Sequence, residues 1–315
     1  MVGRLTLAVL ALLVAGPTHA ITRHALVVGV NAVPDFRIGP VRVRPLRGAE
    51  YDAEEFADTL VEHWGFTERG VTLLVGHAAT HDRVETELSR IERDAAAGDS
   101  VVFYFAGHGT QAPDAPPLDE PADEGLDEAL CLSDANAQGE NLLVDDRLAA
   151  WIRRLKAKRI AVILDCCHSG TGAKGPADQP VARGISLPLA MASATDASSP
   201  SWAELDRVSK STDKQVVALY ACDSGQSAYE RRFAKPAGQP MGQFTRFLLE
   251  ALRDPTVADD DRDGRLSVRE ANGYVARRID AVFNAGRPPK RQQTPRHDAA
   301  RDRWEVLVAP TTEAG

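Results

Sequence analysis

The sequence predicts an α/β protein whose central sheet is mostly parallel and covered by helices on both faces. The prediction rests on apolar runs at residues 25–30, 100–106 and 159–164, which are short and rich in β-branched and aromatic residues, as buried strands are. Between these runs lie segments in which apolar residues recur with helical spacing. Strands that alternate with helices in this order build a parallel sheet with helices on its two sides.

The first half of the chain contains most of the expected elements. A strand at residues 25–30 precedes a helix at 48–63, and a strand at 71–75 precedes a helix that begins near residue 80 and ends near Gly98. The elements expected next are a strand at 100–106, a Pro- and Asp-rich loop at 111–125, a short strand near Leu130, a helix at 145–156 and a strand at 159–164.

The second half begins with a change of composition. Residues 171–213 are rich in Gly, Pro, Ser, Ala and Asp, so we expect most of them to form a mobile surface loop, with a strand only at 185–192. Regular structure resumes after the loop. The elements expected there are a strand at 215–221, helices at 244–252 and 268–282, and a last strand at 304–308.

Composition limits the classes of protein that the chain can represent. Its 315 residues are 43% hydrophobic and 26% charged, which is typical of a globular protein with one large or two small domains. The formal net charge is −8 and there is no strongly basic stretch, which argues against a nucleic-acid partner. An acidic surface favours cationic substrates. We expect the protein to be a monomer.

The first 20 residues have the pattern of a secretory signal. Arg4 precedes an apolar stretch at residues 5–15, and small residues follow at the positions expected before a cleavage site. We therefore expect a mature chain that starts at Ile21 and is periplasmic or secreted. The alternative is an uncleaved membrane anchor, but the apolar stretch is short for a bilayer. No later segment predicts a membrane span, so we expect no membrane association after signal removal.

Two strand ends carry the residues of greatest chemical interest. The strand at 100–106 ends in Gly107-His108-Gly109, and the strand at 159–164 is followed by Asp165, Cys166 and Cys167. Carboxyl ends of parallel strands meet at one edge of a sheet, where ligands bind. A thiol becomes a nucleophile when a histidine takes its proton and backbone amides stabilise the oxyanion. We therefore interpret His108 and Cys167 as a catalytic dyad, the alternative being a loop histidine and a buried structural thiol.

The alternation of side chains along a strand distinguishes the two cysteines. If the strand stays extended, Asp165 and Cys167 lie on one face and Cys166 on the other, which makes Cys167 the expected nucleophile. Asp165 would disfavour a nearby thiolate, so we expect it to receive a substrate cation, which predicts Lys or Arg at the cleavage position. Metal binding by Cys166, Cys167 and His168 lacks the usual ligand spacing, and a redox pair normally has two residues between its cysteines.

A second motif lies at residues 259–270. Its spacing fits the calcium-binding loop of an EF-hand, with a glycine at the sixth position for the sharp turn. The expected calcium ligands are Asp259, Asp261, Asp263, the Arg265 carbonyl, Ser267 and Glu270. The alternative is a solvated acidic turn ahead of a helix that Ser267 caps.

Two hexapeptides carry a resemblance to a known family. Residues 104–109, Tyr-Phe-Ala-Gly-His-Gly, and 165–170, Asp-Cys-Cys-His-Ser-Gly, resemble the two catalytic motifs of metacaspases, caspase-like cysteine peptidases of clan CD, family C14, that cleave after Arg or Lys. The resemblance extends over nearly the whole mature chain. Supporting segments are residues 26–31, 46–52, 127–128, 144–146, 221–230, 242–245 and 293–295.

The resemblance implies a fold and roles for the residues that match. The fold is the caspase-haemoglobinase fold, in which His108 is the general base or acid, Cys167 is the nucleophile, and the amides of Gly109 and Cys167 form the oxyanion hole. Asp52 and Asp165 would line a basic-specific S1 pocket. A serine common in the family is replaced here by Ala106, which removes one polar contact.

The resemblance also implies calcium activation and a division of the chain. Asp127, Asp145 and Asp146 match positions that bind an activating calcium in many metacaspases, although Asp145 alone could cap the helix that follows it. The single peptidase domain at 21–310 divides into a large-subunit-like part at 21–175, a mobile loop at 176–213, and a small-subunit-like part at 214–310 that contains the EF-hand-like loop.

Two functional hypotheses remain from the sequence. The first is a cysteine endopeptidase that acts on proteins or peptides with Arg or Lys at the cleavage position and uses no organic cofactor. Such an enzyme has candidate self-processing sites at Lys174, Arg183, Lys210 and Lys214. The second is a catalytically silent, calcium-binding interaction protein of the same fold, against which the presence of both His108 and Cys167 counts.

Overall fold

A computed structural model of the chain describes seven stretches of the sequence. They are residues 21–34, 37–38, 41–113, 126–167, 180–185, 202–233 and 238–307. The expected signal at 1–20, most of the Pro- and Asp-rich loop, and residues 186–201 of the expected loop and strand lie outside these stretches.

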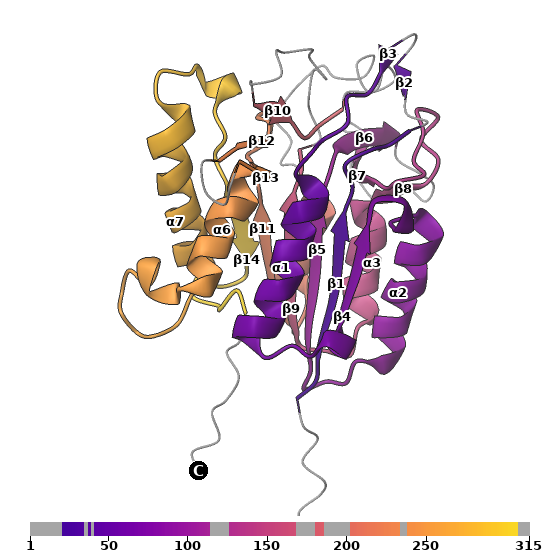
Figure 1. Ribbon diagram of the computed structural model, residues 1–315. Coiled ribbons are helices and arrows are strands. Elements are labelled where there is room, and N and C mark those ends of the chain that lie inside the picture. Colours follow the sequence, from indigo (N-terminus) through magenta and orange to yellow (C-terminus); the bar gives the residue numbers. More distant parts are fainter. Residues whose placement is uncertain are drawn as a thin grey trace, which may run out of the picture.

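The core of the fold is a six-stranded sheet in the order β14-β11-β9-β5-β1-β4 (Figure 1). Five strands are parallel, and β14 at one edge pairs antiparallel with β11, so the predicted mostly parallel sheet is confirmed. The strands are β1 (Arg23–Gly29), β4 (Val71–Val75), β5 (Ser100–Ala106), β9 (Arg159–Asp165), β11 (Gln215–Tyr220) and β14 (Arg296–Ala299).

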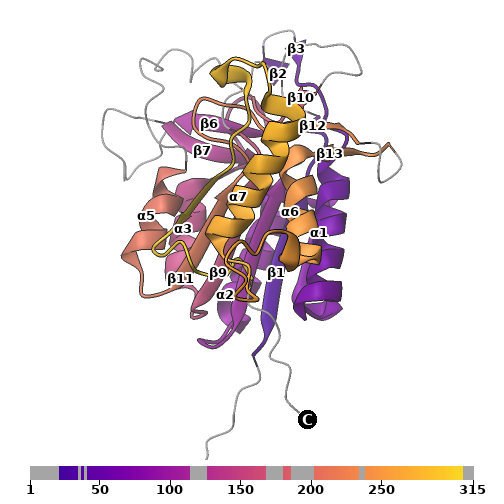
Figure 2. The ribbon, with the colours of Figure 1, turned by 90° about the vertical axis from the view of Figure 1, so that its left-hand side faces the viewer.

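Helices cover both faces of this sheet, as Figure 2 shows from the side. One face carries α1 (Ala49–Trp64), α6 (Gln243–Arg253) and α7 (Val268–Ile279), and the other carries α2 (His81–Asp94), α3 (Asp145–Arg154) and α5 (Ala203–Ser211). Strand residues alternate between the two cores: Val102 and Tyr104 pack under the first set, and Val101 and Phe103 under the second. The whole core therefore depends on the sheet being buried on both sides.

Helix α5 corrects the expectation of a loop over most of residues 171–213. Trp202, Leu205 and Val208 are buried in the core beside the helix, and the Trp202 ring stacks over Tyr220 with 6.4 Å between centroids. The apolar spacing of this short segment is helical, but the polar and small residues around it hide the pattern. Burial against β11 supplies the stabilisation that local propensity lacks.

The expected strand at 304–308 is also wrong within the described residues. The edge strand is β14, and Trp304 lies in a turn. The Trp304 carbonyl accepts a hydrogen bond from the Val268 amide (2.7 Å), and the Val306 amide donates to Leu266 (3.1 Å). Residues 304–306 therefore pair with the residues that precede and begin α7. The edge of the sheet is formed instead by β14, whose residues are more polar.

Small sheets lie beyond the carboxyl ends of the parallel strands, at the top of Figure 1. Of these, the sequence predicted only a short strand near Leu130. Their strands are β2 (Arg37–Ile38) with β3 (Val41–Arg42), β6 (Gly109–Pro113) with β7 (Leu126–Cys131) and β8 (Leu142–Val144), and β10 (Val181–Ala182) with β12 (Tyr229–Arg232) and β13 (Pro240–Gly242). Short 3-10 turns at Glu68–Gly70, Gly76–Ala78, Pro255–Val257 and Pro289–Arg291 and a π-helical turn at Asp280–Asn284 complete the described elements.

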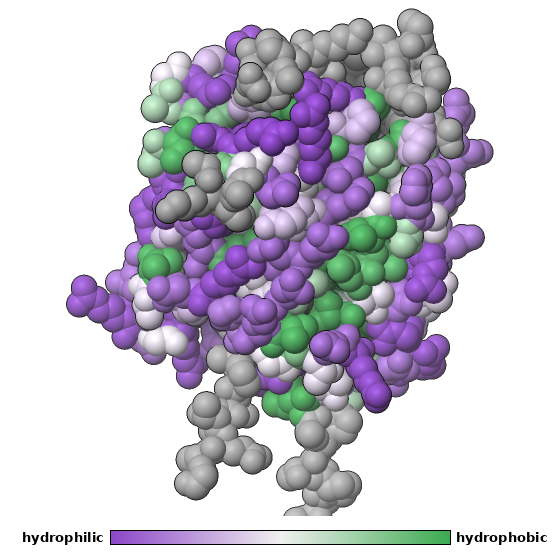
Figure 3. Space-filling view, viewed as in Figure 1, coloured by the Kyte–Doolittle hydropathy of each residue, from purple (hydrophilic) through white to green (hydrophobic). Residues whose placement is uncertain are grey.

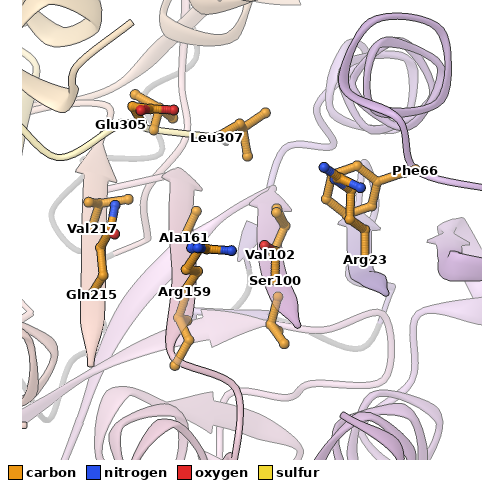
Figure 4. Close-up of a pocket in the computed structure, with 13 residues that line it drawn as sticks. Arg23, Phe66, Ser100, Val102, Arg159, Ala161, Gln215, Val217, Glu305 and Leu307 are labelled. Atoms are coloured by element: carbon orange, nitrogen blue, oxygen red, sulfur yellow. The ribbon is translucent and has the colours of Figure 1, made fainter. Parts of the chain in front are cut away.

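The surface is mostly hydrophilic on the face shown in Figure 3, with hydrophobic groups gathered in its lower centre. Among the helices that the structure describes, none has the length and apolar character needed to cross a membrane. A hollow lies at the amino ends of the strands, where Arg23, Arg159 and Glu305 surround it (Figure 4). It is at the opposite end of the sheet from His108 and Cys167.

Candidate active site

Two neighbouring strands bring the predicted dyad to one edge of the sheet. Strands β5 and β9 pair in parallel with Ala106 opposite Asp165, so that His108 and Cys167 follow at matching heights. The loops that carry them are tightly packed: a Cβ atom on Gly109 would lie 2.6 Å from the Cys167 carbonyl oxygen. A side chain at position 109 would therefore push the histidine loop away from the thiol loop.

The tautomer of His108 follows from its hydrogen bond. Its Nε2 lies 2.9 Å from the Arg44 carbonyl oxygen, which can only accept, so Nε2 carries the proton. In the neutral ring, Nδ1 is then the basic nitrogen, and it is buried with no hydrogen-bond partner among the described residues. Burial lowers the pKa of His108 to about 4. The positive charge of Arg183 also lowers this pKa, whereas the hydrogen bond to the Arg44 carbonyl raises it. The arrangement presents an unprotonated nitrogen that can take a proton.

The Arg44 carbonyl is a site group that sequence reasoning missed. It orients the imidazole as the third group of a catalytic triad orients its base. Because every residue has a backbone carbonyl, no residue type in the sequence marks it. Only the path of the chain between β3 and α1 brings it to His108.

Cys167 has the environment of a nucleophile, and Cys166 does not. The two side chains lie in the cores on opposite faces of the sheet, as the strand alternation predicted. Burial raises the pKa of the Cys167 thiol, but hydrogen bonds from Cys222, the Ala228 backbone and Ser227 outweigh it, and the net pKa is lowered. The pKa of Cys166 is raised well above its usual value, chiefly by burial. Of the two adjacent cysteines, Cys167 is therefore the one whose thiol ionises more readily.

Cys222 is a second site residue that the sequence did not reveal. Its pKa is raised, first by the hydrogen bond to Cys167 and then by burial, so it stays a thiol and donates to its neighbour. It lies just beyond the end of β11, the next strand of the sheet after β9. Together with Cys131, Cys166 and Cys167 it is a free cysteine.

Three buried carboxylates form an acidic pocket beside the thiol. Asp52 comes from α1, Asp165 from the end of β9, and Glu230 from β12, and each is at most 2% exposed. The guanidinium of Arg183, itself 0% exposed, lies among them. Its Nη1 is 3.0 Å from Asp165 Oδ2, and its Nη2 is 3.6 Å from Glu230 Oε2 and also pairs with Asp52. The structure thus brings together the two predicted pocket residues and adds Glu230.

Backbone amides and a hydroxyl group hold the three carboxylates in place. Gly242 donates its amide to Asp52 (2.9 Å), Thr245 donates its hydroxyl to Asp165 (2.6 Å), and the amides of Arg47 and Gly48 donate to Glu230 (2.9 and 3.0 Å). A Cβ on Gly242 would lie 2.1 Å from Asp165 Oδ2, so this position has no room for a side chain. Each carboxylate is therefore held by hydrogen bonds from the surrounding chain as well as by Arg183.

The predicted oxyanion-hole amides converge on a single atom. Gly109 donates its amide to the Arg183 carbonyl oxygen at 3.0 Å, and Cys167 donates its amide to the same oxygen at 3.1 Å. Paired donors at this distance are the arrangement that stabilises the oxyanion of acyl transfer. The geometry that the family resemblance implied for Gly109 and Cys167 is therefore present.

The EF-hand-like loop gathers part of its predicted ligand set. Carboxylate oxygens of Asp259, Asp261 and Asp263 lie within 4.8 Å of one another, and Gly264 turns the chain with a φ of +81°. Ser267 and Glu270 instead bond to each other as a capping box at the start of α7. The helix-capping alternative is thus realised alongside the acidic cluster.

The second predicted calcium set has a different arrangement. Asp127 lies on β7, and Asp145 and Asp146 begin α3. These three are not among the described groups whose ligand atoms all lie within 4.8 Å of one another. Asp145 Oδ2 accepts the Glu204 amide at 3.3 Å, which joins α3 to the start of α5.

The fold is caspase-like. The structure of Caspase-1 from Spodoptera frugiperda matches 92% of this chain over 92% of the caspase chain, with a TM-score of 0.51. The sequence identity is 11%, so the likeness concerns the fold alone. The crystal structure of protein GSU0716 from Geobacter sulfurreducens covers 92% of this chain and 98% of its own, with a TM-score of 0.58 and 26% identity.

Sequence comparison finds similarity to one family. Residues 23–176 match the model described as "Metacaspase, peptidase C14 domain". Metacaspase-1 of Pyricularia oryzae is 31% identical over 157 residues, and Metacaspase-4 of Arabidopsis thaliana is 29% identical over 155 residues. The matches cover 47% of this chain but only 37% and 34% of those relatives, about a third of their length.

Asp52 should impose a pH dependence on stability. Burial raises the pKa of Asp52 to about 7 in the folded protein, and Arg183 opposes the shift. Its contribution to the free energy of unfolding is therefore fully present below the pKa of the unfolded carboxyl and is lost as the pH rises towards 7. Because one pKa unit corresponds to about 1.4 kcal/mol, we expect a loss of up to a few kcal/mol in the wild type and a smaller one in Asp52→Asn. Urea denaturation at several pH values measures it.

Two other groups define the controls for this experiment. Burial raises the pKa of Glu128 to about 7, so Glu128→Gln removes a second contribution of the same sign away from the pocket. His108 acts in the opposite direction: its pKa is lowered to about 4, so its contribution is lost as the pH falls from about 6.5. Parallel curves for the wild type and Asp52→Asn would contradict the assignment.

Proposed function

We propose that the protein is a cysteine endopeptidase that cleaves after Arg or Lys. The observation that carries this proposal is the acidic pocket, because a guanidinium fits it beside a thiol with a lowered pKa. Three buried carboxylates next to the nucleophile favour a cation at the cleavage position. An acidic residue there would add a like charge in a site that excludes water.

The reaction follows from the positions of four groups. The Cys167 thiolate attacks the carbonyl carbon of the substrate residue in the acidic pocket, and the amides of Gly109 and Cys167 stabilise the oxyanion. His108, which took the thiol proton at Nδ1, gives it to the leaving amine as the C–N bond breaks. Water then attacks the thioester, His108 accepts its proton, and the carboxylic acid product leaves with Cys167 restored.

The alternative function is a catalytically silent interaction protein. A silent member of this fold has no need for a histidine with a free buried Nδ1 or for two amides aimed at one oxygen. Both are present here. We therefore favour the peptidase.

We also propose that the protein binds calcium. Asp259, Asp261 and Asp263 offer hard oxygen donors in one loop, and Arg265 adds its carbonyl in the motif. A bound cation would neutralise the mutual repulsion of these carboxylates ahead of α7. The set of Asp127, Asp145 and Asp146 is the alternative position for an activating ion.

Export and a monomeric state complete the proposal. The signal-like pattern of residues 1–20 supports a periplasmic or secreted location, where calcium is available. The dyad, the oxyanion amides and the acidic pocket all come from one chain, which supports an active monomer. The partners are then protein or peptide substrates, with neither nucleic acid nor membrane required.

Cys167→Ala should abolish cleavage of fluorogenic peptides that end in Arg or Lys, and Cys166→Ala should retain it. The reason is that the pKa of the Cys167 thiol is lowered and its amide is one of the two oxyanion donors, while Cys166 lies in the opposite core with a raised pKa. Hydrolysis is followed for peptides ending in Arg, Lys or Asp, with and without calcium. Activity that survives in Cys167→Ala, or a preference for Asp peptides, would sink the proposed function.

Calcium binding should depend on the acidic loop. We expect Asp261→Asn to weaken binding of the metal, measured by titration calorimetry with calcium chloride, because it removes one of three clustered carboxylates. Asp145→Asn is the comparison for the alternative site. Loss of binding in Asp145→Asn alone would move the ion to that set.

The exported protein should begin at Ile21. Mass spectrometry of the protein recovered from outside the cytoplasm reads its amino terminus, and light scattering of the same material gives its molar mass. A chain that keeps residues 1–20, or a dimer mass, would contradict this part of the proposal.

A further inference from the structure

The proposed peptidase chemistry makes no use of the hollow at the amino ends of the strands (Figure 4). Four neighbouring strands pair in register there, so their facing residues form one polar row across the sheet. The row consists of Arg23 on β1, Ser100 on β5, Arg159 on β9 and Gln215 on β11, and all four are half-buried. Two arginines therefore flank the amino end of β5.

Beneath this row the hollow is lined by apolar side chains. Residues two positions further along a strand point to the same face, and here they include Val102, Ala161 and Val217. Phe66 and Leu307 complete the apolar lining. The space among the lining residues is about 340 Å³, part of it open to solvent, which limits a ligand to a small molecule. The hollow therefore combines a cationic edge with an apolar interior.

Neither arginine of the row has a counter-ion among the residues that the structure describes. No hydrogen bond or ion pair in that part of the chain involves either guanidinium group, and Arg23 Nε is buried without a partner. Burial lowers the pKa of Arg23, and the positive charge of Arg159 lowers it further. The two like charges therefore repel each other across β5, and an anion between them would offset that repulsion.

Two acidic side chains beside the row are bound to other groups. Glu305 lines the hollow, but its carboxylate accepts a hydrogen bond from Arg265 at 3.1 Å. Asp99 lies just before β5 and accepts the amides of Thr22 and Ala96, each at 2.8 Å. Neither of these carboxylates pairs with the two arginines of the row. The positive charge at this edge of the sheet is thus left for a ligand.

The two guanidinium groups are placed to share one ligand. Adjacent strands lie about 4.8 Å apart, so the Cα atoms of Arg23 and Arg159, two strands apart, are about 10 Å from each other. In Figure 4 their guanidinium groups lie on either side of Val102. A guanidinium binds a carboxylate or a phosphate through paired N–H donors. The apolar lining favours a carboxylate with an apolar tail, because a phosphate would lose hydration there without gaining a partner.

We propose that the hollow between Arg23 and Arg159 binds a small carboxylate with a short apolar tail. The carboxylate accepts hydrogen bonds from both guanidinium groups, and the tail lies on Val102 and Ala161. Such a ligand joins β1 to β9 across β5, at the opposite end of the sheet from His108. The inference is independent of the proposed function, since no residue that lines the hollow belongs to the proposed active site.

Titration calorimetry of the full chain with sodium isobutyrate tests this inference, in a buffer free of other carboxylates and of phosphate. We expect saturable binding, and a midpoint of thermal unfolding that rises with isobutyrate but not with the same concentration of sodium chloride. Formate has the same charge but no tail, so it should bind about tenfold more weakly, since each buried carbon adds to the affinity. Inorganic phosphate should also bind more weakly than isobutyrate.

Single substitutions locate the site. Arg159→Gln should weaken the binding of isobutyrate by about tenfold or more, because it removes one of the two charged donors. Arg93→Gln is the matched control: Arg93 lies on α2, is exposed and pairs with Asp94 at 2.9 Å, so this variant should bind isobutyrate like the wild type. Circular dichroism shows whether each variant is folded. Arg23→Gln makes the same test if Arg159→Gln fails to fold.

Three results would overturn the inference. They are the absence of saturable isobutyrate binding, an equal loss of binding in Arg93→Gln and Arg159→Gln, and formate or phosphate binding as tightly as isobutyrate. The first removes the site, the second leaves only a general effect of charge, and the third removes the role of the apolar lining. None of these measurements uses peptide hydrolysis, so failure of the proposed peptidase function would leave their result unchanged.

Discussion

The structure depends on one electrostatic constraint: three carboxylates and one guanidinium are buried together without contact with bulk water. Removing one partner from a buried ion pair costs roughly 3–5 kcal/mol, because the charge left behind has neither water nor a counter-ion. Asp52, Asp165 and Glu230 belong to three elements that are far apart in sequence. A cation among them therefore fixes α1, the end of β9 and β12 relative to one another.

The chemistry is set by the same edge of the sheet. Because β5 and β9 are parallel neighbours in register, the residues that follow them meet without any special loop. The tight contact of Gly109 with the Cys167 carbonyl leaves both amides pointing to one side, towards the Arg183 oxygen. The proposed nucleophile, base and oxyanion donors are thus placed by backbone geometry.

Much of this arrangement could be predicted from local patterns. The apolar runs that become β5 and β9 gave the edge position of His108 and Cys167, and strand alternation separated Cys166 from Cys167. What could not be predicted comes from the chain's path in space. The Arg44 carbonyl has no residue signature, and Glu230 and Cys222 reach the site from positions far along the chain. Helix α5 is stabilised by burial of Trp202 against Tyr220, in a segment whose composition is typical of a loop.

A pocket that holds a guanidinium among three carboxylates can bind an arginine of its own chain as well as one of another chain. Any Arg within reach of the site is present at the millimolar effective concentration of a short tether, far above most free substrates. Arg183 is such a residue, since it follows Cys167 by fewer than twenty residues along the chain. The carboxylates that would bind a basic residue of another chain therefore already hold an arginine of this one. The proposed preference for a basic residue and the burial of Arg183 follow from the same three carboxylates.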